Sequence, residues 1–137
     1  MFRQICRATV LRAHATRLCS TEAVQEKLSK LVKENKVVVF MKGTPDQPMC
    51  GFSRAVIQML DIHEVGRVNY STHDVLEDES IRQGIKDFTS WPTIPQVFID
   101  GQFVGGCDIM LELHKSGELI TELKSVGIKS ALDDDDS

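Results

Sequence analysis

The sequence predicts a small α/β domain in which a mixed four-stranded sheet carries helices on both faces. An apolar, β-branched run at residues 37–41 is typical of a strand buried on both faces. An Asp-Gly pair at 100–101, flanked by two short apolar runs, is a strong local signal for a β-hairpin. Segments with helical periodicity alternate with these strands. The order is therefore β-α-β in the first half and β-β-α in the second.

The first half begins with an amphipathic helix, because apolar residues recur there at helical spacing and charged residues fill the other positions. Glycine and proline then mark a loop, and helical periodicity returns at Cys50. The predicted elements, in order, are a helix over 24–32, a strand over 37–41, a loop over 42–48, a helix from 50 to about 64 and a weaker strand over 67–71.

The second half opens with acidic residues at 77–79, which suit the positive end of a helix dipole. The hairpin follows, and Gly105 and Gly106 end its second strand. The predicted elements are a helix over 79–88, strands over 96–99 and 102–104, a helix from Asp108 to about Gly117 and a final helix over 119–126.

The first 20 residues differ in composition from the rest of the chain. They contain four arginines and no acidic residue, with interspersed Thr and Ser, which is typical of a mitochondrial transit peptide. A cationic arm without a targeting role is the alternative. Residues 131–137 are rich in aspartate and are predicted to form a disordered acidic tail. The folded domain is therefore expected to span residues 21–130.

Composition also disfavours two classes of partner. Without the leader, the chain carries 12 basic and 20 acidic side chains, a balance that argues against nucleic-acid binding. No stretch reaches the roughly 20 apolar residues that a membrane-spanning helix needs. We therefore expect neither a nucleic-acid partner nor a membrane partner.

The cysteines of the domain are Cys50 and Cys107, because the other two lie in the leader. Because these two cysteines lie far apart in the sequence, they form neither a Cys-x-x-Cys redox pair nor a zinc-binding pattern. Cys50 lies at the start of a predicted helix, where the dipole and unpaired N–H groups lower a thiol's pKa. Lys42 is expected to add positive potential, and Ser53 stands where a dithiol protein has its second cysteine. The alternative for Cys50 is a small residue packed in the core.

Four motifs, taken together and in order, resemble the monothiol glutaredoxins, and the mitochondrial glutaredoxin 5 type most of all. They are residues 42–45 (KGTP), 50–53 (CGFS), 91–95 (WPTIP) and 105–108 (GGCD). The resemblance covers roughly residues 22–130. It implies a thioredoxin-like fold, binding of glutathione and a [2Fe–2S] cluster, and a role in iron–sulfur cluster assembly in the mitochondrial matrix.

The resemblance also implies where glutathione binds. Cys50 is the expected catalytic and metal-ligating residue, and Phe52 neighbours it in the motif. The expected roles of the others are as follows: Lys42, Arg82 and Lys86 face the glycine carboxylate; Thr93, Ile94 and a cis Pro95 offer backbone to the peptide; Gly106, Cys107 and Asp108 receive the γ-glutamyl end. For Arg82 and Lys86, a merely solvated helix face is the alternative reading.

The number of ligands explains how one cysteine can serve a cluster. A [2Fe–2S] centre usually takes four thiolates. Two chains supply two through Cys50, and two glutathiones complete the set, so the cluster-bound form is expected to be a homodimer. Scaffold proteins and recipient proteins are its expected partners.

Two other functions remain open at this point. Cys50 alone suffices for glutathione-dependent thiol–disulfide exchange, in which it forms a mixed disulfide that a second glutathione releases. Cys50 and Cys107 could also form a disulfide in a redox sensor. A packed structural role for Cys107 is an equally good interpretation.

Overall fold

The computed structural model describes residues 22–133 and confirms the predicted architecture. Its four-stranded sheet has the order β2-β1-β3-β4, in which β1 pairs parallel with β2 and antiparallel with β3. A helix over residues 22–31 comes first. The labelled elements are β1 Val37–Met41, α2 Gly51–Ile62, β2 Tyr70–Asp74, α3 Glu79–Thr89, β3 Gln96–Ile99, β4 Gln102–Gly105, α4 Cys107–Ser116 and α5 Glu118–Ser125.

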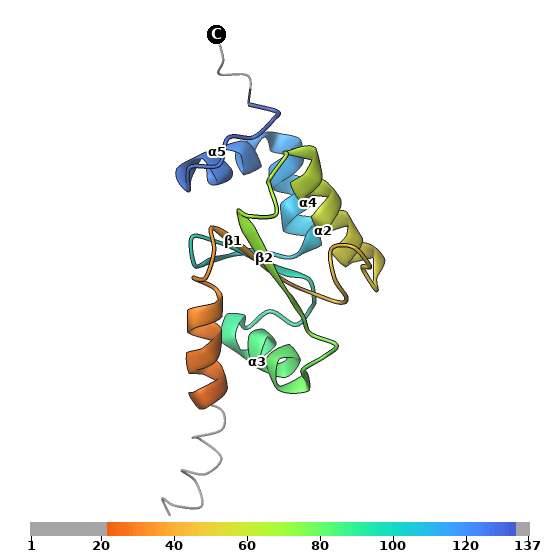
Figure 1. The fold of residues 1–137 in the computed structure, drawn as a ribbon, viewed down its shortest axis with the longest axis vertical. Coiled ribbons are helices and arrows are strands. Elements are labelled where there is room, and N and C mark those ends of the chain that lie inside the picture. Colours follow the sequence, from red (N-terminus) through yellow and green to blue (C-terminus); the bar gives the residue numbers. More distant parts are fainter. Residues whose placement is uncertain (1–21, 134–137) are drawn as a thin grey trace, which may run out of the picture.

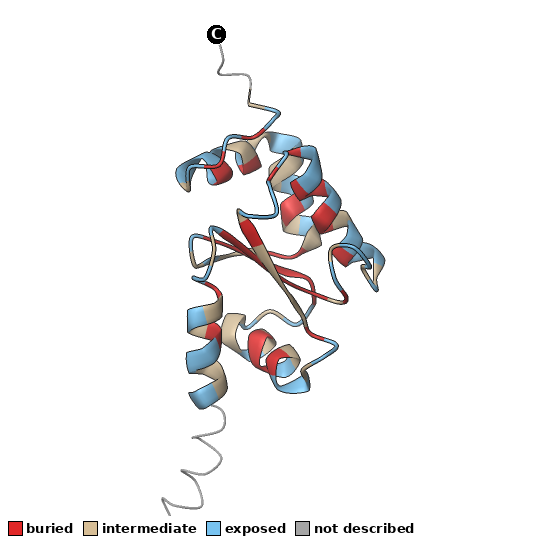
Figure 2. Cartoon of the chain, in the orientation of Figure 1, coloured by how far each residue is buried: buried red, intermediate tan, exposed pale blue. Residues whose placement is uncertain are grey.

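Helices cover both faces of the sheet (Figure 1). On one face α2, α4 and α5 pack against Val37, Val39 and Met41 of β1. On the other face α3 and the helix at 22–31 pack against Val38 and Phe40. All five residues of β1 are therefore buried, as the red strand in the centre of Figure 2 shows. The uninterrupted apolar run of β1 thus reflects burial on both sides.

The predicted hairpin is formed by β3 and β4. Asp100 and Gly101 connect the strands, and both have positive φ, as the tight turn of a two-residue hairpin requires. β4 lies at one edge of the sheet, and the single residue Gly106 joins it to α4. The hairpin therefore fixes where α4 begins.

The predicted strand at 67–71 is wrong in position, because β2 spans Tyr70–Asp74. The residues before it form a turn in which the Asn69 N–H donates to the Gly66 carbonyl, and Val68 is exposed. Hydrogen bonding to β1 sets the strand's limits, with Val37 opposite Tyr70. Since β2 is an edge strand, its polar residues carry little of the apolar alternation on which a sequence prediction depends.

Several predictions concern the ends of the chain. The transit peptide proposed for residues 1–20 lies outside the described residues, as do residues 134–137 of the acidic tail. Residues 131–133 pack back onto the domain, because the Ala131 N–H donates to the His63 carbonyl at 3.0 Å and Asp133 lies 3.6 Å from Lys124. Residues 131–133 therefore contact the domain, and the domain boundary at residue 130 stays a prediction. In the described part of the chain, no helix is long and apolar enough to cross a membrane.

Candidate functional site

Cys50 is the N-cap residue of α2. Its backbone is extended, with φ −151° and ψ 150°, and its Sγ accepts a hydrogen bond from the Ser53 N–H at 3.4 Å. An N-cap side chain satisfies one of the free N–H groups of the first helical turn. In this helix the thiol takes the place of the usual oxygen acceptor, so the sulfur lies at the positive end of the dipole.

The pKa of the Cys50 thiol is lowered from its ordinary value. Partial burial opposes ionisation, but hydrogen bonds from the Ser53 N–H, the Ser53 hydroxyl and the Phe52 N–H, together with the positive charge of Lys42, outweigh it. The predicted direction of the pKa shift of Cys50 is therefore confirmed.

Cys107 also begins a helix, yet its pKa is raised. Burial is the main cause, and the negative charges of Asp108 and of Cys50 add to it. Cys107 is the first residue inside α4 and not its cap, and the cap position is Gly106. The pKa values of the two thiols are therefore shifted in opposite directions, so Cys50 ionises more readily than Cys107.

The loop between β1 and α2 is tied down at both ends and in the middle. The Met49 N–H donates to the Lys42 carbonyl at 2.9 Å, and the Gly43 N–H donates to the Asp74 carboxylate, also at 2.9 Å. Asp46 near the loop tip pairs with Arg67 at 3.0 Å. These contacts hold Lys42 beside the start of α2.

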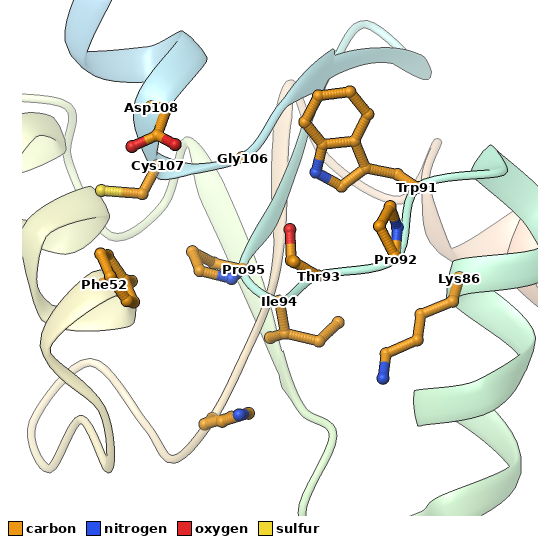
Figure 3. A pocket seen from close by; sticks show the side chains of 11 residues that line it. Phe52, Lys86, Trp91, Pro92, Thr93, Ile94, Pro95, Gly106, Cys107 and Asp108 are labelled. Carbon is orange, nitrogen blue, oxygen red and sulfur yellow. The ribbon is translucent and has the colours of Figure 1, made fainter.

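A cleft of about 380 Å³ opens beside Cys50. Figure 3 shows the 91–95 loop running between the start of α4, with Cys107 and Asp108, and Lys86 of α3. The lining residues come from three parts of the fold: the end of β1 with the start of α2, then α3 with the loop that follows it, and finally the start of α4. They are Lys42, Phe52, Lys86, Trp91, Pro92, Thr93, Ile94, Pro95, Gly106, Cys107 and Asp108.

All but two of the predicted binding residues line this cleft. Cys50 lies beside the lining, next to Phe52 and close enough to Cys107 to influence its pKa. Arg82 is not part of the lining, and its guanidinium lies 3.8 Å from Glu79. Pro95 follows a cis peptide bond, as expected. The contact predicted for Arg82 stays a prediction.

Sequence reasoning missed Gln96, which holds the cleft loop in place. This side chain is fully buried, and its Nε2 donates to the carbonyls of Trp91 at 2.9 Å and Thr93 at 3.2 Å. Its Oε1 accepts from the Thr89 hydroxyl at 2.9 Å. The sequence did contain a signal for this role, because Gln96 is a single amide at the start of an otherwise apolar strand. A buried amide side chain needs hydrogen-bond partners.

Gly106 allows the cleft to close tightly around the start of α4. A Cβ at this position would lie 3.2 Å from the Pro95 carbonyl oxygen and 3.3 Å from Trp91 Nε1. Gly106 also caps α4 without a side-chain hydrogen bond, so no cap side chain competes for the N–H groups of the first turn, whose residues Cys107 and Asp108 line the cleft. A carboxylate is the natural ligand for such an end of a helix.

The fold, with a cleft that opens beside Cys50, is a thioredoxin-like architecture. Residues 37–104 match the family model of glutaredoxin. The chain belongs to the glutaredoxin family.

Its relatives include monothiol members named as mitochondrial. The chain is 60% identical to the mitochondrial glutaredoxin-related protein 5 of Danio rerio over 116 residues, 85% of this chain and 74% of the relative. It is 50% identical to mitochondrial monothiol glutaredoxin-5 of Schizosaccharomyces pombe over 110 residues, 80% of this chain and 75% of that one. A buckwheat glutaredoxin–glutathione complex superposes with a TM-score of 0.68 at 29% identity, covering 80% of this chain and 96% of the other.

Proposed function

We propose that this protein binds glutathione in the cleft beside Cys50 and, as a homodimer, carries a [2Fe–2S] cluster to recipient proteins. The observation that carries the proposal is a single activated thiol, Cys50, at the mouth of a cleft that has a cationic end and a helix-terminal end. Ser53 stands where a resolving cysteine would be, so Cys50 cannot form a disulfide within its motif.

The charges of the cleft suit a peptide with carboxylates at both ends. Lys42 and Lys86 form one end, where a carboxylate would pair with ammonium groups. At the other end, the first turn of α4 offers N–H groups to the second carboxylate, and Asp108 is a partner for the ligand's ammonium group. The backbone at Thr93 and Ile94 lies between them. The glutathione complex of the buckwheat relative supports the same ligand class.

The cluster is a cargo, and the donor set of this chain fits a shared site. Among residues 22–133, no group of three or more His, Cys, Asp or Glu side chains is arranged to hold a metal ion. In the site that we propose, each chain supplies one thiolate, from Cys50, and four are usual for a [2Fe–2S] centre. A second chain and two glutathiones would supply the other three. Thiols from bound glutathione exchange readily, which suits transfer to a recipient.

The place of action that we propose is the mitochondrial matrix, with cluster scaffold and recipient proteins as partners. Two kinds of evidence support it. Residues 1–20 are arginine-bearing and free of acidic residues, and the Danio rerio and Schizosaccharomyces pombe relatives are named as mitochondrial.

Anaerobic reconstitution of the chain with iron, sulfide and glutathione tests the proposal. We expect visible charge-transfer bands that coelute with a dimer in size-exclusion chromatography. Cys50→Ser, or omission of glutathione, should abolish both the bands and the dimer, whereas Cys107→Ser should retain them. A cluster bound to the monomer, or bound without glutathione, would refute the proposal.

Glutathione-dependent thiol–disulfide exchange is the second candidate, and the lowered pKa of Cys50 favours it. The Cys50 thiolate would attack the glutathione sulfur of a mixed disulfide and release the substrate thiolate. A second glutathione thiolate would then attack the glutathione sulfur on Cys50, which forms glutathione disulfide and releases the Cys50 thiolate. Turnover of a glutathionylated peptide by a colourless monomer that does not take up cluster would identify this activity as the main one.

A further inference from the structure

The edge strand β4 borders a second groove, which is separate from the cleft beside Cys50. This β4 groove has a volume of about 370 Å³, and its lining comes from the turn after β3, from β4, from α4 and from α5. None of its lining residues also lines the cleft. The proposed function therefore leaves the β4 groove without a role.

The part of the β4 groove between β4 and α4 is apolar. Val104, Ile109 and Leu113 line it, and each of these side chains is only half-buried in the folded chain. Val104 and Leu113 pack at the margin of the core that α2, α4 and α5 form on one face of the sheet. Because burial of apolar surface is favourable, this part of the groove suits an apolar side chain.

The backbone of β4 has free hydrogen-bonding groups beside the groove. The hairpin turn has two residues, so Ile99 and Gln102 form the hydrogen-bonded pair that closes it, and Phe103 belongs to the next, non-hydrogen-bonded pair. The N–H and C=O groups of Phe103 therefore point away from β3, and β4 is the last strand of the sheet. Within residues 22–133, no loop or cap hydrogen bond engages either group. β4 also contains neither lysine nor proline, which commonly block such an edge.

Two carboxylates lie at the rim of the β4 groove. Asp100 and Glu122 both line it, and both are exposed. Neither has an ion-pair partner in the part of the chain that the structure describes. The lining itself, all of it described, contains no basic side chain. A cationic side chain is therefore the complementary group for this rim.

We propose that the β4 groove docks an extended segment of a partner protein, which adds a strand to β4 and carries an apolar and a basic side chain two residues apart. Pairing with the Phe103 backbone supplies the hydrogen bonds of strand addition. Residues i and i+2 of a strand lie on the same face, so one side chain reaches the apolar part while the other approaches Asp100 or Glu122. The inference requires neither glutathione nor a cluster.

Panning of a phage-displayed library of random heptapeptides on the full, cluster-free chain tests the spacing. We expect enrichment of sequences in which one residue separates an apolar residue from lysine or arginine. Enrichment without this spacing would overturn the inference.

Hydrogen exchange then locates the bound peptide. With a synthetic peptide of the enriched sequence, the Phe103 amide of the ¹⁵N-labelled chain should exchange roughly tenfold more slowly, because its N–H gains a partner. The same peptide, N-methylated through its apolar-x-basic core, should give no such protection. A bound peptide that leaves the exchange of Phe103 unchanged would overturn the inference.

Glu122→Lys tests the charge of the occupant. It should weaken binding of the basic peptide about fivefold and strengthen binding of a peptide with glutamate in place of the basic residue, because exposed ion pairs have about this effect. Glu112→Lys is the matched control, since it makes the same charge change at an exposed position of α4 outside the groove lining. If both variants act equally, only the net charge of the chain matters and the inference is overturned.

Cys50→Ser separates the β4 groove from the cleft. This variant should bind the peptide as the wild type does, because Cys50 lines no part of the groove. Loss of peptide binding would place the peptide in the cleft and overturn the inference. A cluster-free dimer with Phe103 protected in the absence of peptide would identify a second copy as the occupant, and would overturn it too. Failed cluster reconstitution with peptide binding intact would overturn only the proposed function.

Discussion

Gly105→Ala tests how tightly the hairpin is joined to α4 beside the cleft. Gly105 has φ +151°, which side chains rarely adopt, and a Cβ there would lie 2.6 Å from Ile109 Cβ. Strained backbone costs about 1–3 kcal/mol, and overpacking a core contact costs a similar amount. We therefore expect the free energy of unfolding to fall by about 3 kcal/mol. For a domain of this size, that corresponds to a Tm lower by about 10–15 °C.

Gly117→Ala separates the two contributions. Gly117 has φ +84°, but an added Cβ would meet no atom within 4 Å, so only the backbone strain of about 1 kcal/mol applies. Thermal and urea unfolding of both variants measure the difference. If Gly105→Ala loses no more stability than Gly117→Ala, then the contact with Ile109 does not constrain this junction. Because Gly105 precedes Cys107 by two residues, we also expect Gly105→Ala, and not Gly117→Ala, to weaken glutathione binding.

Three further predictions concern buried polar groups and the two thiols. Gln96→Leu leaves two cleft-loop carbonyls without their donor, so it should cost about 2 kcal/mol in urea unfolding and weaken glutathione binding in calorimetry. Burial and the neighbouring His114 lower the pKa of His63, so the folded state resists protonation. The free energy of unfolding should therefore be fully retained above about pH 6.5 and decline below it, a decline that His63→Gln should reduce. At pH 7, Cys50 should be alkylated roughly tenfold faster than Cys107 or more.

Each of these predictions has a contrary result. Unchanged glutathione affinity in Gln96→Leu would mean that the loop keeps its shape without the amide. Identical pH profiles of stability for wild type and His63→Gln would show that His63 does not titrate on unfolding. Equal alkylation rates would contradict the opposite shifts of the two thiols.

Much of this protein could be predicted from local sequence patterns. The β1 run, the Asp100–Gly101 turn and the helical periodicities each depend on neighbouring residues alone, and the structure confirms them. Cys50 at a helix start is a local feature as well, so the direction of its pKa shift could be predicted from the helix dipole and the free N–H groups of the first turn. Resemblance to a known family then predicted most of the residues that line the cleft, although Arg82 is not among the lining residues.

Only the tertiary structure decided the features that depend on distant partners. β2 takes its limits from pairing with β1, because an edge strand has little apolar pattern of its own. Cys107 also begins a helix, and an argument from the dipole alone would have lowered its pKa. Burial and the charge of Asp108 reverse that direction. Helix position is encoded locally, but desolvation and hydrogen-bond partners exist only once the chain has folded.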